Sequence, residues 1–201
     1  ELFSIHLGRE LRLYEVLCGP PLTYPQLAAR AGIAPRYARE WLEQQAVAGV
    51  LRAVDDDTDP YARTFALPDA QREVLLEEES PYFVGTLAGF VASIAGVVPD
   101  VVTAFRTGGG VPYDAYGDGT RHGIGGLNRP VFQAQVAEWI AEMPDVHGRL
   151  AGGAARVLDL GCGTGWSSIA VAEAFPLVHV HGVDLDEASV ADAGRNAHSR
   201  G

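Results

Sequence analysis

The sequence predicts a mixed α/β fold in which a small helical domain precedes the beginning of a parallel α/β unit. Two observations carry this prediction. Residues 4–68 contain three helical periods followed by two short alternating runs, and residues 156–184 contain two short apolar runs separated by a glycine turn and a helical run. The chain has 201 residues, of which 47% are hydrophobic, enough for one domain or two small ones.

The parallel unit is predicted from the order of its segments. An apolar run from Arg156 to Leu160 ends at Gly161, as a buried parallel strand does. Helical spacing follows from Ser167 to Phe175, with a helix start expected near residues 164–166, and a second apolar run from Val178 to Val183 ends in Asp184. Strand, glycine turn, helix, strand and acid form half of a nucleotide-binding α/β unit.

The glycine turn reads D-x-G-x-G-x-G, with Asp159 two residues before the first of three glycines, Gly161, Gly163 and Gly165. Without a Cβ, the backbone can adopt positive φ and lie against a ligand. The free N–H groups at the start of the following helix point at the same turn. Dinucleotide-binding turns prefer G-x-G-x-x-G, so this spacing favours a ligand without a pyrophosphate.

The spelling L-D-L-G-C-G-T-G resembles the first motif of the class I S-adenosylmethionine-dependent methyltransferases, and the resemblance extends from Arg156 to about Gly201. It implies a Rossmann-like doubly wound domain that binds S-adenosyl-L-methionine and transfers its methyl group to a small-molecule acceptor. The cofactor-binding residues implied are Asp159, Gly161, Cys162, Gly163, Gly165, Asp184 and Leu185. By this match Asp159 lies near the amino end of the cofactor, Asp184 accepts both ribose hydroxyls, and Leu185 lies beside the adenine.

No catalytic residue can be named, because the later strands usually supply the base. Only the first two strands of the doubly wound sheet are found here, and two parallel strands do not form a stable open sheet alone. We therefore expect the later strands to be absent from this chain and the chain to be the front portion of a longer protein. The methyl acceptor, and whether O, N or C is attacked, stay open.

Charge and cysteine content restrict the partners and the compartment. The net charge of −11 disfavours nucleic acid, because phosphates need local positive charge. The two cysteines, Cys18 and Cys162, are far apart and have no visible partner base, so both are interpreted as structural thiols. The N-terminus shows no secretion signal, and we expect a cytoplasmic protein.

The N-terminal region predicts a winged helix-turn-helix domain. Its expected elements are three helices and a hairpin, over Ser4–Leu17, Tyr24–Arg30, Ala34–Ala48, Val50–Val54 and Tyr61–Leu67. This region resembles the winged-helix domain that precedes the catalytic domain in some bacterial methyltransferases. In small-molecule O-methyltransferases such a domain usually forms the dimer contact, whereas in regulators it reads DNA.

Charge favours the dimer contact. The candidate recognition helix carries Glu40 and Glu43 beside Arg36 and Arg39. The wing adds four acids, Asp55, Asp56, Asp57 and Asp59. These carboxylates would meet phosphate with the wrong sign, so DNA binding is unlikely and a homodimer is expected. The alternative function is a winged-helix transcriptional regulator or metabolite-sensing protein with a non-catalytic cofactor domain.

The expected domains are a winged-helix domain over residues 1–78, a helical connector with a glycine-rich loop over 79–143, and the cofactor domain over 144–201. Residues 80–99 carry no charge, but their acidic flanks and glycines favour a buried helix over a membrane span. Gly85, Gly89 and Ser93 are spaced by four and allow another backbone to come close. That backbone can belong to a second chain or to the same subunit. Four larger side chains are expected on the opposite side: Phe83, Leu87, Phe90 and Ile94.

Residues 111–126 hold five glycines and predict a long loop, either a lid over the pocket or a linker. From this loop Tyr113, Tyr116 or Arg121 could reach the cofactor's carboxylate, while His122 lacks any visible partner as a base. A helix is expected over Asn128–Met143, with Phe132 and Trp139 as pocket walls or as core. No metal site is expected, because the pair His179 and His181 has no third ligand at sensible spacing.

Overall fold

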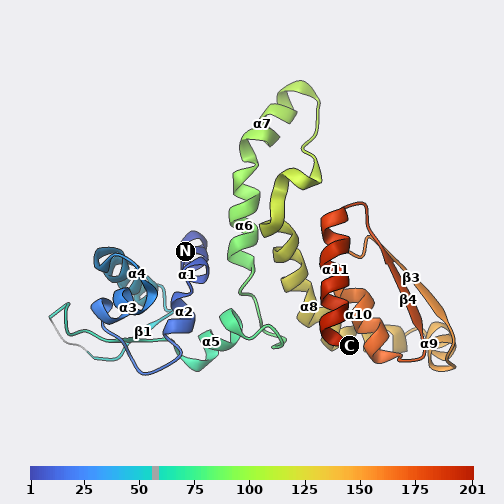
Figure 1. Cartoon of the computed structure of the whole chain (residues 1–201), viewed down its shortest axis with the longest axis horizontal. Helices are drawn as coiled ribbons and strands as arrows, with labels where there is room; N and C mark the ends of the chain where they lie inside the picture. Colours follow the sequence, from blue (N-terminus) through green and yellow to red (C-terminus); the bar gives the residue numbers. More distant parts are fainter. Residues whose placement is uncertain (56–58) are drawn as a thin grey trace. The chain divides into compact units, whose positions relative to one another are not determined.

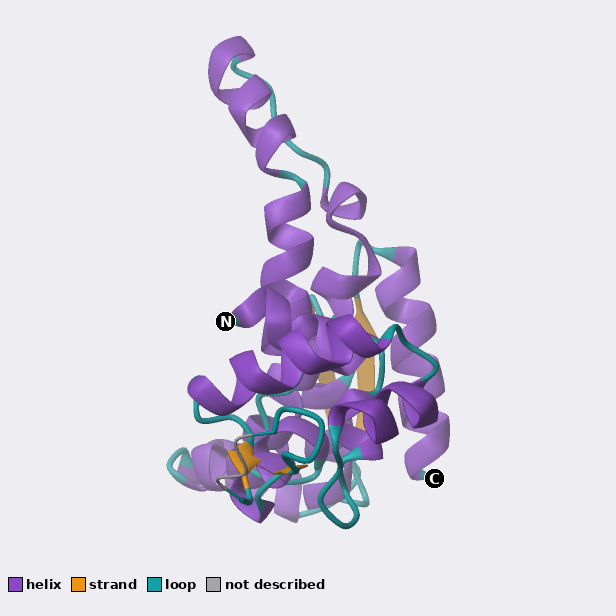
Figure 2. Cartoon of the chain, turned by 90° about the vertical axis from the view of Figure 1, so that its left-hand side faces the viewer, coloured by secondary structure: helices purple, strands orange, loops and turns teal. Residues whose placement is uncertain are grey.

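A computed structural model describes residues 1–55 and 59–201 (Figure 1). The chain divides into two compact units, residues Glu1–Ala88 and Gly89–Gly201, and each is described by itself. Helices make up most of the described residues, and the strands form two separate two-stranded sheets (Figure 2). Asp56 and Asp57 of the expected acidic wing lie outside the described residues.

The first unit has the winged helix-turn-helix fold predicted from the sequence. Its elements are α1 (Leu2–Glu10), α2 (Leu13–Val16), α3 (Tyr24–Ala31), α4 (Pro35–Val47), β1 (Arg52–Ala53), β2 (Phe65–Ala66) and α5 (Asp69–Leu76). The antiparallel pair β1–β2 forms the wing, and Phe65 also bridges Leu22. Helix α3 starts with a capping box in which Thr23 and Gln26 exchange hydrogen bonds.

The single helix expected over residues 4–17 is wrong, because the chain breaks between α1 and α2. Arg12 adopts a left-handed conformation with φ 55°, which ends the first helical run. The break turns Leu13 and Tyr14 into the core, where both side chains are fully buried. The Tyr14 hydroxyl donates a hydrogen bond to the buried Gln45 side chain, so tertiary packing offsets the local strain.

The second unit contains the predicted order of strand, turn, helix and strand. Helix α6 (Leu87–Gly96) spans the boundary between the units, and α7 (Val98–Thr107), the 3₁₀ turn η1 (Tyr113–Tyr116), α8 (Gly117–Ala141) and α9 (Pro144–Ala151) follow. The sheet and its helices are β3 (Arg156–Leu160), α10 (Trp166–Ala174), β4 (His179–Val183) and α11 (Glu187–Arg200). Strands β3 and β4 are parallel, with Arg156 opposite His179 and Leu160 opposite Val183.

One face of this sheet is covered and the other is open. Val157 and Val180 pack against a small core formed by Leu150, Phe175 and Val178. On the other face Leu158 and Leu160 are 60% and 75% exposed. The prediction of buried strands is therefore correct for one face only.

The loop expected over residues 111–126 is wrong, because most of it belongs to the 25-residue helix α8. The glycines mark places where α8 meets its neighbours. Gly119 faces the Ser93 side chain of α6, Gly123 faces Phe90 of α6, and Gly125 faces Thr164 of the glycine turn. Helical glycine costs about 1 kcal/mol relative to alanine, and the close packing that it permits offsets this cost. Helix α8 thus lies between α6 and the pair α10 and α11 (Figure 1).

The uncharged segment 80–99 also differs from the prediction, since its helix begins only at Leu87. Ser93 and Phe90 both face α8, so Phe90 does not lie on the opposite side from the small residues. This close packing is therefore within one chain, the second of the two alternatives left open. No single helix of the described residues has the length and apolar character to cross a membrane, although α6 and α7, bent by 44° between them, pass that test as a pair.

We predict that Gly123→Ala destabilises the protein by about 1–3 kcal/mol through overpacking. A Cβ at this position would lie 2.5 Å from the Phe90 Cβ atom, so the backbone must shift. The control is Gly148→Ala in α9, where a Cβ meets nothing within 4 Å. That change is expected to raise the free energy of unfolding by up to ~1 kcal/mol in urea denaturation. Equal effects of the two substitutions would contradict close packing at Gly123.

Candidate functional site

The glycine turn is fixed to the carboxyl end of both strands. The N–H groups of Gly161 and Cys162 donate to the Val183 carbonyl at 2.8 and 3.0 Å, and the Gly165 N–H donates to the Cys162 carbonyl at 2.9 Å. These bonds fold the chain back over the end of β4 before α10 begins. The turn therefore lies beside Asp184, the residue that follows β4.

The three glycines serve two purposes. Their φ values are 74° at Gly161, 53° at Gly163 and 85° at Gly165, a region that other residues rarely adopt. A Cβ at Gly161 or Gly163 would meet nothing within 4 Å, so these two present bare backbone to the surroundings. A Cβ at Gly165 would lie 2.9 Å from the Ala193 Cβ atom, so this glycine lets α11 approach the turn.

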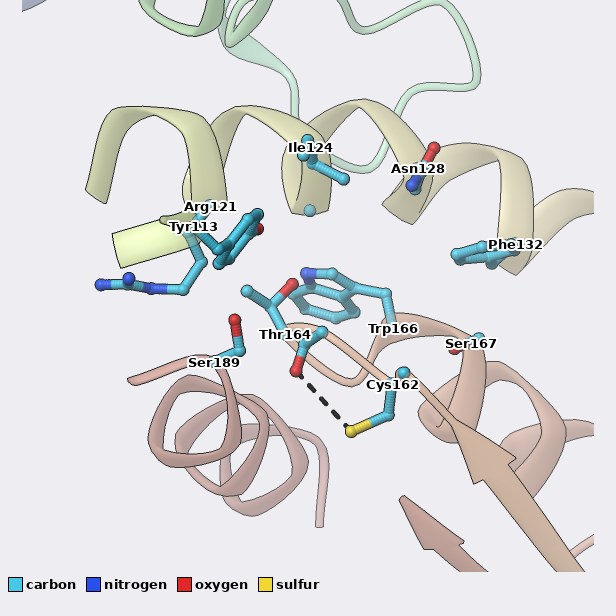
Figure 3. Close-up of a pocket in the computed structure, with 13 residues that line it drawn as sticks. Tyr113, Arg121, Ile124, Asn128, Phe132, Cys162, Thr164, Trp166, Ser167 and Ser189 are labelled. Carbon is cyan, nitrogen blue, oxygen red and sulfur yellow. Dashed lines mark hydrogen bonds between the residues drawn. The ribbon is translucent and has the colours of Figure 1, made fainter. Parts of the chain in front are cut away.

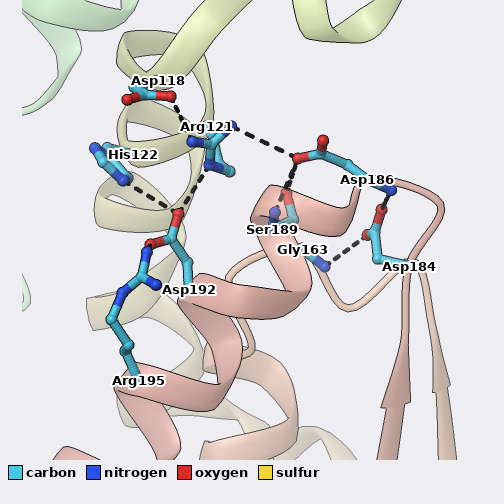
Figure 4. A network of polar contacts seen from close by, with 9 residues as sticks. All are labelled: Asp118, Arg121, His122, Gly163, Asp184, Asp186, Ser189, Asp192 and Arg195. Carbon is cyan, nitrogen blue, oxygen red and sulfur yellow. Dashed lines mark hydrogen bonds and ion pairs between the residues drawn. The ribbon is translucent and has the colours of Figure 1, made fainter.

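The Asp184 carboxylate is oriented by two backbone amides. Its Oδ2 atom accepts from the Gly163 N–H at 2.8 Å, and its Oδ1 atom accepts from the Asp186 N–H at 2.9 Å (Figure 4). A carboxylate oxygen has two lone pairs, so each oxygen retains capacity for a further donor. Leu185, between these two acids, is fully exposed.

Asp159 is held by the first turn of α10. Its Oδ2 atom accepts from the Ser167 hydroxyl at 2.6 Å and from the Ser168 hydroxyl at 2.7 Å. The sequence motif alone assigns no role to these serines. The signal available was the pair of hydroxyl residues directly after the glycine turn, at the start of the expected helix.

A pocket lies between the glycine turn and α8 (Figure 3). Of the predicted site residues, Gly161, Cys162 and Gly163 line it. The other four, Asp159, Gly165, Asp184 and Leu185, lie outside its lining. The remaining walls come from η1, α8 and the residues that start α10 and α11: Tyr113, Arg121, Ile124, Gly125, Asn128, Phe132, Thr164, Trp166, Ser167 and Ser189.

Helix α8 supplies the wall that the sequence analysis assigned to a loop. Tyr113, Arg121 and Phe132 line the pocket, whereas Trp139 does not and is 43% exposed. Trp166 was not foreseen. Its indole ring lies 4.2 Å from the Arg129 guanidinium carbon, a cation–π contact between α10 and α8.

Burial controls the protonation of two groups at this pocket. It raises the pKa of the Tyr113 hydroxyl, and the Asp186 and Asp184 carboxylates raise it further. Burial also raises the pKa of the Cys162 thiol, with Asp159 and Asp184 adding to the shift. Cys162 packs tightly under β4, since a Cβ at Gly182 would lie 3.0 Å from its Sγ atom. Both groups are therefore neutral near pH 7, and the arrangement suits a packed, unreactive thiol.

The histidines of α8 and β4 lie in different surroundings. His122 has a partner after all, because its Nε2 atom lies 3.2 Å from the Asp192 Oδ2 atom of α11. His179 and His181 are exposed on the open face of β4. Within residues 1–55 and 59–201 there is no group of three or more His, Cys, Asp or Glu side chains that could hold a metal ion.

We predict that iodoacetamide modifies Cys162 more slowly than Cys18 at pH 7, because Cys162 is buried and Cys18 is exposed, while burial raises the pKa of both thiols. A raised pKa means that the thiolate fraction is small at neutral pH, so the rate should rise about tenfold per pH unit up to the raised pKa. Mass spectrometry of the labelled peptides measures both rates, and labelling in urea is the control that equalises access. Fast modification of Cys162 at pH 7 with no dependence on pH would contradict this environment.

Two protein-family models match the chain, one in each of its two units. Residues 157–201 match the model of a methyltransferase domain, and residues 2–76 match that of an Rv2258c-like winged helix-turn-helix domain. The chain is 35% identical over 100 residues to the tetracenomycin polyketide synthesis 8-O-methyl transferase TcmO of Streptomyces glaucescens. That alignment covers 49% of this chain and 27% of TcmO, so the chain spans well under two thirds of the relative.

Solved structures share the fold across both units. The mitomycin 7-O-methyltransferase MmcR superposes with a TM-score of 0.67 at 22% identity, over 99% of this chain and 60% of that one. Human N-acetylserotonin methyltransferase, solved in complex with S-adenosylmethionine, gives a TM-score of 0.62 at 16% identity, over 89% of this chain and 54% of that one. The chain therefore carries a winged helix-turn-helix domain, followed by residues that match a methyltransferase domain.

Proposed function

We propose that this protein transfers a methyl group from S-adenosyl-L-methionine to a small-molecule acceptor. The observation that carries the proposal is the bare glycine turn beside an oriented carboxylate. Gly161 and Gly163 expose backbone with no Cβ, and the Gly163 N–H itself orients Asp184 at 2.8 Å. The names of TcmO, MmcR and the human enzyme, all methyltransferases, support the same reaction class.

The described residues fit this cofactor. Asp184 has remaining acceptor capacity on each oxygen, which suits the two hydroxyls of a ribose. Leu185 is an exposed apolar side chain directly after Asp184, and we assign it to the adenine. Asp159, whose direction is fixed by Ser167 and Ser168, acts near the amino end. Cys162 and Gly165 contribute by packing under the turn.

When bound, the cofactor supplies an activated methyl group on its sulfonium. The chain's own residues then have to hold donor and acceptor in line, at about 3 Å, and to exclude water. Ile124, Phe132 and Trp166 give the pocket an apolar wall that suits the body of an organic acceptor. Tyr113 stays protonated near neutral pH and can donate a hydrogen bond from the same wall. We assign no residue as the base.

A DNA-binding regulator is the rival function, and the charges on α4 weigh against it. Arg39 pairs with Glu43 at 3.2 Å, and Arg63 of the wing region lies 4.0 Å from the same carboxylate. Paired arginines have less positive field to offer to phosphates, in a chain whose net charge is −11. A gel shift that falls steeply with rising salt would instead support the regulator.

We predict that calorimetry detects binding of S-adenosylhomocysteine and none of NAD. Asp184→Ala should weaken that binding by at least about tenfold, because hydrogen bonds to a charged group contribute about 1.5–3 kcal/mol each. The control is Asp145→Ala, which removes an exposed carboxylate at the start of α9, outside the pocket. Heat with NAD alone, or unchanged affinity in Asp184→Ala, would overturn the assignment.

We also propose that the protein forms a homodimer through its winged-helix unit. The small residues of α6 pack against α8 of the same chain. A groove between α1 and α4 is the candidate contact, because apolar side chains dominate its lining. They include Leu7, Leu11, Leu13, Ile33, Tyr37 and Trp41. Leu7 and Tyr37 are 54% and 71% exposed, an unusual state for side chains that gather in one groove.

We predict a dimer by size-exclusion chromatography with light scattering at micromolar concentration. Tyr37→Glu should convert it to a monomer, because the change places a charge in the apolar groove. Val47→Glu is the matched control, since Val47 lies on the same helix, is 92% exposed and is not part of this groove. A monomeric parent protein, or dissociation by Val47→Glu alone, would rule out this contact.

A further inference from the structure

We infer that Arg121 is a positioning residue that holds the Asp184–Asp186 turn in the geometry required to bind the cofactor. This inference rests on the proposed function. Arg121 lies in the first turns of α8 and is separated in sequence from all of its partners on α11. One guanidinium thereby connects α8 to Asp186, two residues after the proposed ribose contact Asp184.

The guanidinium of Arg121 faces three carboxylates (Figure 4). Its Nε atom donates to the Asp192 Oδ2 atom at 2.8 Å, and one terminal nitrogen lies 3.7 Å from the Asp186 Oδ2 atom. The other terminal nitrogen pairs with Asp118 one turn earlier on α8. The side chains of Arg121, Asp192 and Asp186 are only 12%, 10% and 15% exposed, whereas Asp118 is 77% exposed.

A continuous series of contacts leads from Arg121 to the glycine turn. Asp186 is the N-cap of α11, and its Oδ2 atom accepts from the Ser189 N–H at 2.9 Å and from the Ser189 hydroxyl at 2.6 Å. The Asp186 N–H donates to Asp184, and Asp184 in turn accepts from the Gly163 N–H. Movement of Asp186 is therefore transmitted to both the proposed ribose contact and the bare backbone.

Arg121 helps to lower the pKa values of two carboxylates, Asp186 and Asp192. Hydrogen bonds from Ser189 chiefly lower the pKa of Asp186, and Arg121 contributes to the same shift. Burial acts to raise the pKa of Asp192, but hydrogen bonds from Arg121 and Arg195 outweigh it and lower the pKa overall. Both acids are thus ionised near neutral pH, and the planar guanidinium between them offsets their repulsion. Lysine is a point charge and cannot reach both in the same way.

Arg195 separates positioning from simple charge neutralisation. It also pairs with Asp192, but it lies three residues further along α11, so this ion pair stays within one helix. His122 of α8 adds a second contact to Asp192 at 3.2 Å. If Asp192 only needs a positive partner, removal of either arginine should have the same effect. If α8 positions the turn, only removal of Arg121 should matter.

Calorimetric titration with S-adenosylhomocysteine tests this inference on the whole chain. We expect Arg121→Gln to weaken binding by about tenfold and Arg195→Gln by less than about twofold, with circular dichroism spectra like that of the parent. Arg121→Lys should recover only part of the loss. Equal weakening by the two glutamine substitutions, or none by Arg121→Gln, would overturn the inference.

Arg121 also lines the pocket, so a direct contact with the ligand must be separated from positioning. In a double-mutant cycle, Asp192→Asn should weaken binding in the same direction although Asp192 does not line the pocket. The double variant Arg121→Gln/Asp192→Asn should then bind about as well as Arg121→Gln alone, because both changes break one connection. Additive losses would place Arg121 on the ligand instead and refute the positioning role.

Hydrogen exchange without ligand distinguishes failure of this inference from failure of the proposed function. Arg121→Gln should raise exchange in peptides that cover residues 184–190, because the turn loses its tie to α8, while Arg195→Gln should leave these peptides unchanged. If the parent protein binds no S-adenosylhomocysteine, the proposed function fails and the exchange result still decides the positioning role. Unchanged exchange in Arg121→Gln contradicts that role.

Discussion

The hydrogen bonds from Gly161 and Cys162 to the Val183 carbonyl are the contacts on which the site depends. They bind the turn after one strand to the last residue of the other, so two segments about twenty residues apart become one surface. The chain can follow this path because Gly161 and Gly163 adopt positive φ. The backbone there is bare because glycine has no Cβ. The same geometry brings the Gly163 N–H to Asp184, which means that the turn also orients the acid.

Helix α8 completes the site from the outside. Its glycines at 119, 123 and 125 allow contact with α6 on one side and with Thr164 of the turn on the other. Its side chains then reach the pocket from Arg121 at one end to Phe132 further along, and Tyr113 of η1 joins them. The residue type that weakens an isolated helix is here what lets the helix fit between its neighbours.

The sequence predicted the parts of the fold that local spacing determines. Strand, glycine turn, helix and acid follow each other within 156–184, and the short-range pattern sufficed for them. The many glycines of 111–126 led to the wrong prediction of a loop. Glycine usually indicates a turn, and the neighbouring helix that these glycines pack against cannot be identified from the sequence. Contacts such as that between His122 and Asp192, 70 residues apart, have no local signal at all. The serines that hold Asp159 were within reach of the sequence analysis, since they directly follow the turn.

The open side of the two-stranded sheet has an energetic consequence. Leu158 and Leu160 extend their side chains into water next to a turn that otherwise has firm backbone bonds. Burying a leucine contributes on the order of 1–3 kcal/mol, and each of these two forgoes much of that gain while it stays hydrated. The stability of this unit against heat or urea therefore depends on apolar contacts that cover Leu158 and Leu160 as much as on its own small core.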